Sequence, residues 1–365
     1  MAIFTVPADF KVSTLDNISL NNSQYEIPVA ESYGSLRNSL IGSGRKYFEL
    51  PEVTTDGLRA YIRKCNDTGI TFNYTLNLAC FSNNEFTQKG KEELIDSIGK
   101  LVDCGVSQFT VAMPSIIELL DAYFSNIKIT LSVITGVDSL SKMKAFSRLK
   151  NINSIYIHEK IYRQLNLLKG ITHIAHDNGI KVGVIVNSFC LSDCPYRCYH
   201  YNFGAHATAG SEYIIPEYYG SRCALMKIAD KRNVLTAPWI RPDDIDRYID
   251  CGVDKFKISG REMHTNGADI ERVVQTYNSR KYDGNLADLF MCFTQCAYSE
   301  IFNIKNDKNL DNYLSRVLGG VISCNVGGCS DCMQCKEALL SIAVNREGAD
   351  KWSKIFYDRI RVFRK

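Results

Sequence analysis

The chain has 365 residues, of which 45% are apolar and 23% are charged, ordinary values for a globular protein. The net charge of +3 is too small to indicate a nucleic-acid or membrane partner, and no apolar run is long enough for a transmembrane helix. The first residues lack the pattern of a signal peptide, so we expect a cytoplasmic protein. In that reducing compartment, the 14 cysteines are expected to be metal ligands or buried thiols rather than disulfides.

Short apolar runs alternate with amphipathic helical stretches such as Gly90–Val102 and Tyr162–Asp177. The predicted strands are, in chain order, Ile27–Leu36, Thr71–Leu78, Gln108–Met113, Ile127–Ile134, Ser154–His158, Lys181–Asn187, Val234–Ile240 and Lys255–Ser259. Eight strands with helical crossovers favour an α/β fold, a TIM-like (β/α)8 barrel. A doubly wound sheet is disfavoured, because no GxGxxG follows the first predicted strand.

The pattern divides the chain into three parts. We place an N-terminal segment at residues 1–26, the barrel at 27–285 and a Cys-rich C-terminal extension at 286–365. The length also accommodates this arrangement of one large barrel with an appendage.

Polar side chains follow several predicted strands, at the end of the barrel where the chemistry of such folds lies. Among them, Arg241, Lys257 and Arg261 are expected to hold a carboxylate or phosphate of the substrate. Tyr33 is a candidate for proton transfer. For each of these residues, a structural ion pair or a solvated position is the alternative.

A cluster of cysteines follows the predicted strand Lys181–Asn187, in the stretch FCLSDCPYRCYHYNFGAHA. Its members, with one downstream residue, are Cys190, Cys194, Cys198 and Cys223. Structural zinc usually shows tighter pairs, whereas thiolate ligation with a Cys-Pro element is common around iron–sulfur clusters. We predict a [4Fe–4S] cluster on these cysteines; zinc and the absence of any metal are the alternatives. His200 and His206 are candidates for proton transfer or for a structural role.

A second group, CNVGGCSDCMQC, has ferredoxin-like spacing and predicts a second metal site, with iron–sulfur ahead of zinc. Its cysteines are Cys324, Cys329, Cys332 and Cys335. Cys292 and Cys296 could contribute to either site. Radical-SAM enzymes also combine a barrel with three cysteines, but their CxxxCxxC follows the first strand, so we exclude that class.

The stretches NSFCLSDCPYRCYHYNFGAHA, Arg222-Cys223 and APWIRPDDIDRYIDCGVDKFKISGRE resemble the U32 peptidase-like family over most of residues 25–280. The resemblance implies a barrel-borne iron–sulfur cluster on Cys190, Cys194 and Cys223, with Cys198 or a C-terminal cysteine as the fourth ligand. Better-understood members resemble oxygen-independent hydroxylases that act on RNA bases or quinone precursors and take oxygen from prephenate. A nucleic-acid partner is therefore an expectation from the family and not from the charge.

The chain departs from that family in three respects. It does not match the peptidase signature, its cysteine spacing is more compact, and its second cysteine group is additional. We therefore expect a divergent iron–sulfur enzyme with redox or hydroxylation-type chemistry on a small molecule, a peptide or a modified biopolymer. The alternatives are a non-catalytic iron–sulfur subunit that binds a related barrel protein, a zinc-stabilised binding protein, and a peptidase.

Overall fold

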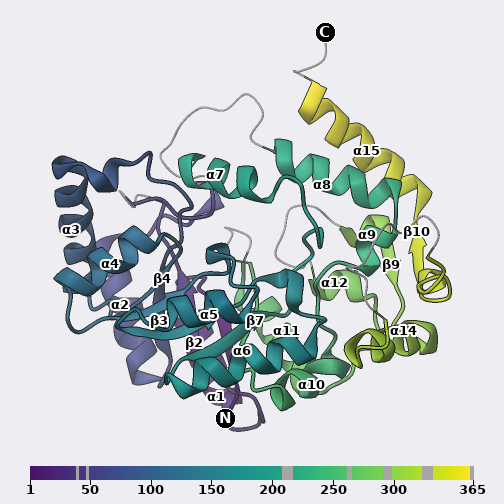
Figure 1. Ribbon diagram of the computed structural model, residues 1–365, viewed down its shortest axis with the longest axis horizontal. Coiled ribbons are helices and arrows are strands. Elements are labelled where there is room, and N and C mark those ends of the chain that lie inside the picture. Colours follow the sequence, from purple (N-terminus) through teal and green to yellow (C-terminus); the bar gives the residue numbers. More distant parts are fainter. Residues whose placement is uncertain are drawn as a thin grey trace.

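The computed structural model describes residues 1–37, 41–46, 49–207, 217–260, 265–290, 298–322 and 332–361. It contains a closed barrel of parallel strands, each hydrogen-bonded to the next and the last to the first (Figure 1). The strands are β1 Ile3–Pro7, β2 Val29–Gly34, β3 Thr71–Leu76, β4 Gln108–Val111, β5 Lys128–Leu131, β6 Ile152–Tyr156, β7 Lys181–Ile185 and β8 Lys255–Lys257. The predicted TIM-like barrel is confirmed.

Helices connect the strands and cover the outside of the barrel. They are α1 Val12–Asn22, α2 Thr55–Asp67, α3 Gln88–Asp103, α4 Pro114–Tyr123, α5 Leu140–Phe146, α6 Leu165–Asp177, α10 Ile245–Asp250 and α11 Gly267–Asn278. Thr54 and Thr87 cap α2 and α3 by accepting a backbone N–H three residues ahead. Gly69 and Gly179, just beyond α2 and α6, have φ angles of 71° and 70°, the left-handed conformation that ends a helix before a strand.

One predicted strand is absent, and one observed strand was not predicted, so the number of barrel strands agrees with the prediction although their identities differ. The first barrel strand is β1, so the barrel begins near residue 3 and not at residue 27. The sequence prediction places the apolar run of β1, IFTVP, in an N-terminal segment instead, because it precedes the region where strands and helices alternate. Residues 234–240 form no strand: the short helix α9, Arg232–Leu235, leads into Pro238, which has no N–H to give to a ladder. The first cysteine cluster therefore follows the seventh strand, not the sixth.

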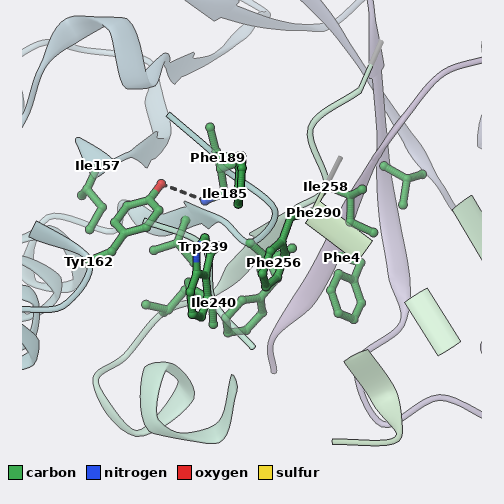
Figure 2. Close-up of a cluster of buried hydrophobic side chains, with 14 of the residues drawn as sticks. Phe4, Ile157, Tyr162, Ile185, Phe189, Trp239, Ile240, Phe256, Ile258 and Phe290 are labelled. Atoms are coloured by element: carbon green, nitrogen blue, oxygen red, sulfur yellow. Dashed lines mark hydrogen bonds between the residues drawn. The ribbon is translucent and has the colours of Figure 1, made fainter. Parts of the chain in front are cut away.

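The apolar character of residues 234–240 reflects burial outside the barrel wall. Trp239 stacks on Phe290 with ring centroids 4.9 Å apart (Figure 2). The guanidinium of Arg163 lies 4.8 Å from the centre of the indole. Arg163 also donates to the carbonyls of Leu235 and Ala237 at 2.7 Å. Arg163 therefore supplies hydrogen-bond donors to the backbone carbonyls of this irregular segment, which neighbouring strands would supply in a sheet.

The C-terminal extension packs beside the mouth of the barrel. It comprises α12 Leu286–Phe290, α13 Tyr298–Ile301, α14 Lys308–Leu318, the antiparallel pair β9 Phe302–Ile304 and β10 Ile342–Val344, and α15 Arg346–Ile360. α15 packs against α8, Tyr218–Ala229, which follows α7, Arg197–Ala207 (Figure 1). In the part of the chain that the structure describes, we find no helix with the length and apolar character needed to span a membrane.

The barrel interior holds a buried ion pair. The ammonium of Lys255 lies 2.6 Å from a carboxylate oxygen of Glu31, and both side chains are at most 4% exposed. Thr5 and Asn73 donate to the same carboxylate at 3.1 and 3.4 Å. Tyr156 in turn donates to the hydroxyl of Thr5 at 3.0 Å, so the pair belongs to a connected polar network.

We predict that Lys255→Met lowers the free energy of unfolding by about 3–5 kcal/mol, because it leaves the Glu31 carboxylate buried without its counter-charge. The midpoint of urea unfolding measures the loss. Lys100→Met is the control, since Lys100 pairs with Asp96 on the surface, where both side chains are more than 60% exposed. Equal losses in the two variants would contradict the stabilising role of the buried pair.

Candidate functional site

A cavity of about 290 Å³ lies at the carboxyl ends of the barrel strands, where the chemistry of such barrels is placed. Strand ends and loops form its floor, and α7 and α8 contribute to the opposite wall. Its chemistry-bearing side chains include Tyr33, Arg45, Asn77, Tyr156, Glu159, Cys190, Cys194, Arg197, His200, Tyr219, Cys223, Lys227 and Lys257.

A larger cavity of about 500 Å³ lies between α6 and the end of α14 and shares Glu159 and Leu191 with the first. Among the described residues, its wall contains no cysteine or histidine. The smaller cavity is the candidate site, because the reactive groups gather there.

Three of the predicted cysteine ligands line the candidate site. Cys190 and Cys194 lie in the loop after β7, and Cys223 comes from α8. Burial, and then the negative charge of Glu159, raise the pKa of the Cys190 thiol to about 12, although its side chain opens onto the cavity. Burial also raises the pKa of Cys194. Cys223 lines the same cavity from a separate segment of the chain, and its charge raises the pKa of both thiols further.

Two predicted site residues lie elsewhere. Cys198 and His206 are exposed on α7 and do not line the cavity. Helix α7 begins at Arg197, and its turn carries Cys198 away from the loop that holds Cys190 and Cys194. The structure therefore places Cys198 outside the group of thiols around the cavity.

Arg241 was wrongly predicted to hold a substrate anion. Its guanidinium is buried and donates to Asp244 at 2.7 and 3.0 Å. It also donates to Asn306 at 2.9 Å and to Asp311 at 3.0 Å. These acceptors bind a side chain that joins the barrel to the extension, and they explain why the charge is tolerated there.

Lys257 and Tyr33, two of the predicted site residues, both line the cavity and lie against each other. The ammonium of Lys257, at the end of β8, lies 3.6 Å from the ring centre of Tyr33 and 4.9 Å from that of Tyr156. The hydroxyl of Tyr33 donates to the carbonyl of Ile258 at 2.9 Å. The floor of the cavity therefore presents a cation held against two aromatic faces.

The loop that carries Cys190 is fixed by a buried carboxylate and a buried guanidinium. Glu159, just after β6, accepts short hydrogen bonds from Ser188 and from Arg197. Arg197 also donates to the carbonyl of Leu191 at 2.7 Å. Residues on both sides of Cys190 are thereby tied to one ion pair.

Sequence reasoning missed two residues of the site, Arg197 and Lys227. Lys227 is buried in α8, with its ammonium 2.7 Å from the sulfur of Cys223. The sequence spacing could have indicated that both cations lie near the thiols. Lys227 follows Cys223 by four residues, one turn of a helix, and Arg197 follows Cys194 by three.

The second cysteine group is only partly described. Arg261, Cys292, Cys296, Cys324 and Cys329 lie outside the described residues. Cys332 is exposed, and Cys335 is partly buried against the hydrophobic core. Within the described ranges, no three His, Cys, Asp or Glu side chains converge tightly enough to hold a single metal ion.

His200 lies at the mouth of the cavity, with its ring stacked on Tyr219 at 5.7 Å. Loss of solvent around the imidazole, together with the positive charges of Arg45 and Lys46, lowers the pKa of His200 to about 4. The imidazole is therefore neutral at neutral pH and can accept a hydrogen bond from a ligand in the cavity.

We predict that His200→Gln makes the protein less sensitive to acid between pH 6.5 and 4. In this window the unfolded chain binds a proton at His200 that the folded chain does not, so stability falls as the pH is lowered. Urea unfolding at pH 7 and pH 4.5 measures the difference. The same change at His173, which is exposed on α6, is the control. An acid loss in His200→Gln equal to that in wild type would contradict the assignment.

Comparisons with known proteins give two informative matches. The chain is 30% identical over 301 residues to the uncharacterized protease MJ1657 of Methanocaldococcus jannaschii, a match that covers 81% of this chain and 84% of that protein. It is also similar to the solved structure of the U32 peptidase Mk0906, with a TM-score of 0.51 and 16% identity over 72% of this chain and 94% of that one. At that identity the likeness shows the fold alone. No family model matches the chain.

Proposed function

The chain belongs to the U32 peptidase-like family, and we propose that it is an iron–sulfur enzyme with redox or hydroxylation-type chemistry in the cavity at the barrel mouth. One observation carries the proposal: three thiols from two separate segments, Cys190, Cys194 and Cys223, line the same cavity. Packing alone gives no reason for three thiols to face one cavity, whereas thiolates around a cavity are the usual ligands of iron–sulfur clusters.

The chemistry of the three thiols supports a [4Fe–4S] cluster, since such clusters are held by cysteine thiolates. Cys190, Cys194 and Cys223 would hold it, and the cations of Arg197 and Lys227 favour the charged form of Cys190 and Cys194. When bound by three thiolates, such a cluster supplies an iron with an open position that acts as a Lewis acid or as an electron carrier.

The other groups of the cavity suit a small anionic substrate. Lys257, held against the rings of Tyr33 and Tyr156, would attract a carboxylate or phosphate. Neutral His200 would accept a hydrogen bond or a proton at the mouth. The aromatic side chains of Phe189, Phe290 and Tyr298 line the same cavity and would exclude water from it.

A peptidase is the second candidate, and the contact between Cys223 and Lys227 favours it. An ammonium next to a sulfur stabilises a thiolate, and a thiolate is a nucleophile for acyl transfer. In that case Cys223 would attack a carbonyl and Cys190 would be dispensable. The two candidates therefore predict different effects of the Cys190→Ala change.

We predict that protein purified without oxygen contains iron and acid-labile sulfide. Cys190→Ala and Cys223→Ala should lose roughly half of both or more, since the ligands of one cluster are broken. Cys198→Ala is the matched control and should keep the full amount, because Cys198 is exposed and lies off the cavity. Iron and sulfide analysis with EPR spectra measures all four proteins.

Two results would refute the cluster in the cavity. One is wild-type protein without iron and sulfide. The other is full iron in both Cys190→Ala and Cys223→Ala. Peptide hydrolysis by iron-free protein that is lost in Cys223→Ala and kept in Cys190→Ala would establish the peptidase instead.

The second cysteine group supports a further prediction. We propose that Cys324, Cys329, Cys332 and Cys335 hold a second cluster, on the spacing of the sequence alone. Cys332→Ala should then lose roughly half of the iron and keep the EPR signal of the cavity cluster. Undiminished iron in this variant would show that the chain holds one cluster.

A further inference from the structure

Lys227 is the most deeply buried cation of the cavity wall. It lies on α8, its side chain is 1% exposed, and its ammonium is 2.7 Å from the sulfur of Cys223. The ring centres of Phe189 and Tyr298 lie 5.4 and 5.8 Å from the ammonium. The surroundings of this charge are therefore one sulfur and two aromatic faces.

Such a position is costly for an ammonium. Removing a charge from water costs several kcal/mol unless a partner compensates, and two aromatic faces supply part of that compensation. Arg197 is the other cation near the thiols, and it forms an ion pair with Glu159. Lys227 occurs in none of the ion pairs of the described residues, so its remaining partner is the sulfur of Cys223.

Lys227 lines the same cavity as Cys190 and Cys194. A single ammonium therefore stands in the wall that carries all three thiols, in a position that solvent does not screen.

We propose that Lys227 is a tuning residue: through its contact with the Cys223 sulfur, it raises the reduction potential of the cluster held by Cys190, Cys194 and Cys223. The inference rests on the proposed iron–sulfur function. Reduction adds one electron, and hence one negative charge, to the cluster, and a nearby buried cation stabilises the reduced form more than the oxidised form. Hydrogen bonds to the sulfurs of a cluster act in the same direction.

The test is a redox titration, followed by EPR, of protein that retains its cluster. Lys227→Met keeps the length of the side chain and removes both the charge and the N–H donor. We expect full iron and sulfide, with the equilibrium between reduced and oxidised cluster shifted about tenfold towards the oxidised form. For a one-electron couple this is a potential about 59 mV lower.

Two further variants separate the causes. Lys227→Gln keeps an N–H donor without the charge and should give a smaller fall in potential than Lys227→Met. Lys257→Met removes a cation that faces the same cavity but lies against Tyr33 rather than Cys223, and its potential should stay close to that of wild type. Thermal unfolding of each variant checks that the fold is intact.

The outcomes separate this inference from the proposed function. Wild-type protein without iron overturns both. An unchanged potential in Lys227→Met with full iron overturns the tuning role and leaves the cluster in place. Loss of iron from both Lys227 variants, with the unfolding temperature unchanged, would make Lys227 a residue needed for cluster assembly and would also overturn the tuning role.

Discussion

The arrangement of the cavity depends on the buried ion pair between Arg197 and Glu159. Glu159 is held near the barrel because it lies three residues after the end of β6, and Arg197 opens α7. Between them runs the loop that carries Cys190 and Cys194, which is further tied down where Ser188 donates to Glu159 and Leu191 accepts from Arg197. The position of two thiols relative to the barrel is thus set by one carboxylate and one guanidinium, each with its hydrogen-bonding capacity largely used.

The floor of the same cavity is continuous with the polar interior of the barrel. Tyr156 faces the cavity, and its hydroxyl donates inward to Thr5, which donates to Glu31 in the pair with Lys255. Barrel interiors are usually filled with branched apolar side chains. Here, polar groups replace part of that packing, so the orientation of Tyr156 is fixed by hydrogen bonds and not by shape alone. The cation of Lys257 rests on a ring whose position is determined in this way.

The class of fold could be predicted because helices and buried strands alternate over most of the chain and glycines mark the helix ends. The exact strands could not be predicted. The apolar residues around Trp239 have the sequence pattern of a strand, but Arg163 and Phe290 bury them in an irregular segment. Contacts distant in sequence decide such cases. They lie beyond any local pattern.

The site, like the fold, could be predicted only in part. Cys190, Cys194 and Cys223 could be identified because residue type and spacing restrict what thiols do. Arg241 misled for the opposite reason: a cation near a strand end looks the same whether it faces a ligand or a carboxylate such as Asp244, and only the fold distinguishes them. The burial of Lys227 could not be predicted from the sequence either. Its importance comes from the contact with Cys223 rather than from its position in the sequence.

The two cations nearest the thiols have different surroundings. Arg197 is paired with Glu159, so its charge is largely compensated within the protein. Lys227 is directed at Cys223. Burial raises the pKa of Cys190 and Cys194 despite these two cations, so ionising both thiols together is unfavourable. A metal of the kind proposed above would offset this cost by bonding to the thiolates directly, which is why the proposed cluster and the folding of the loop would depend on each other.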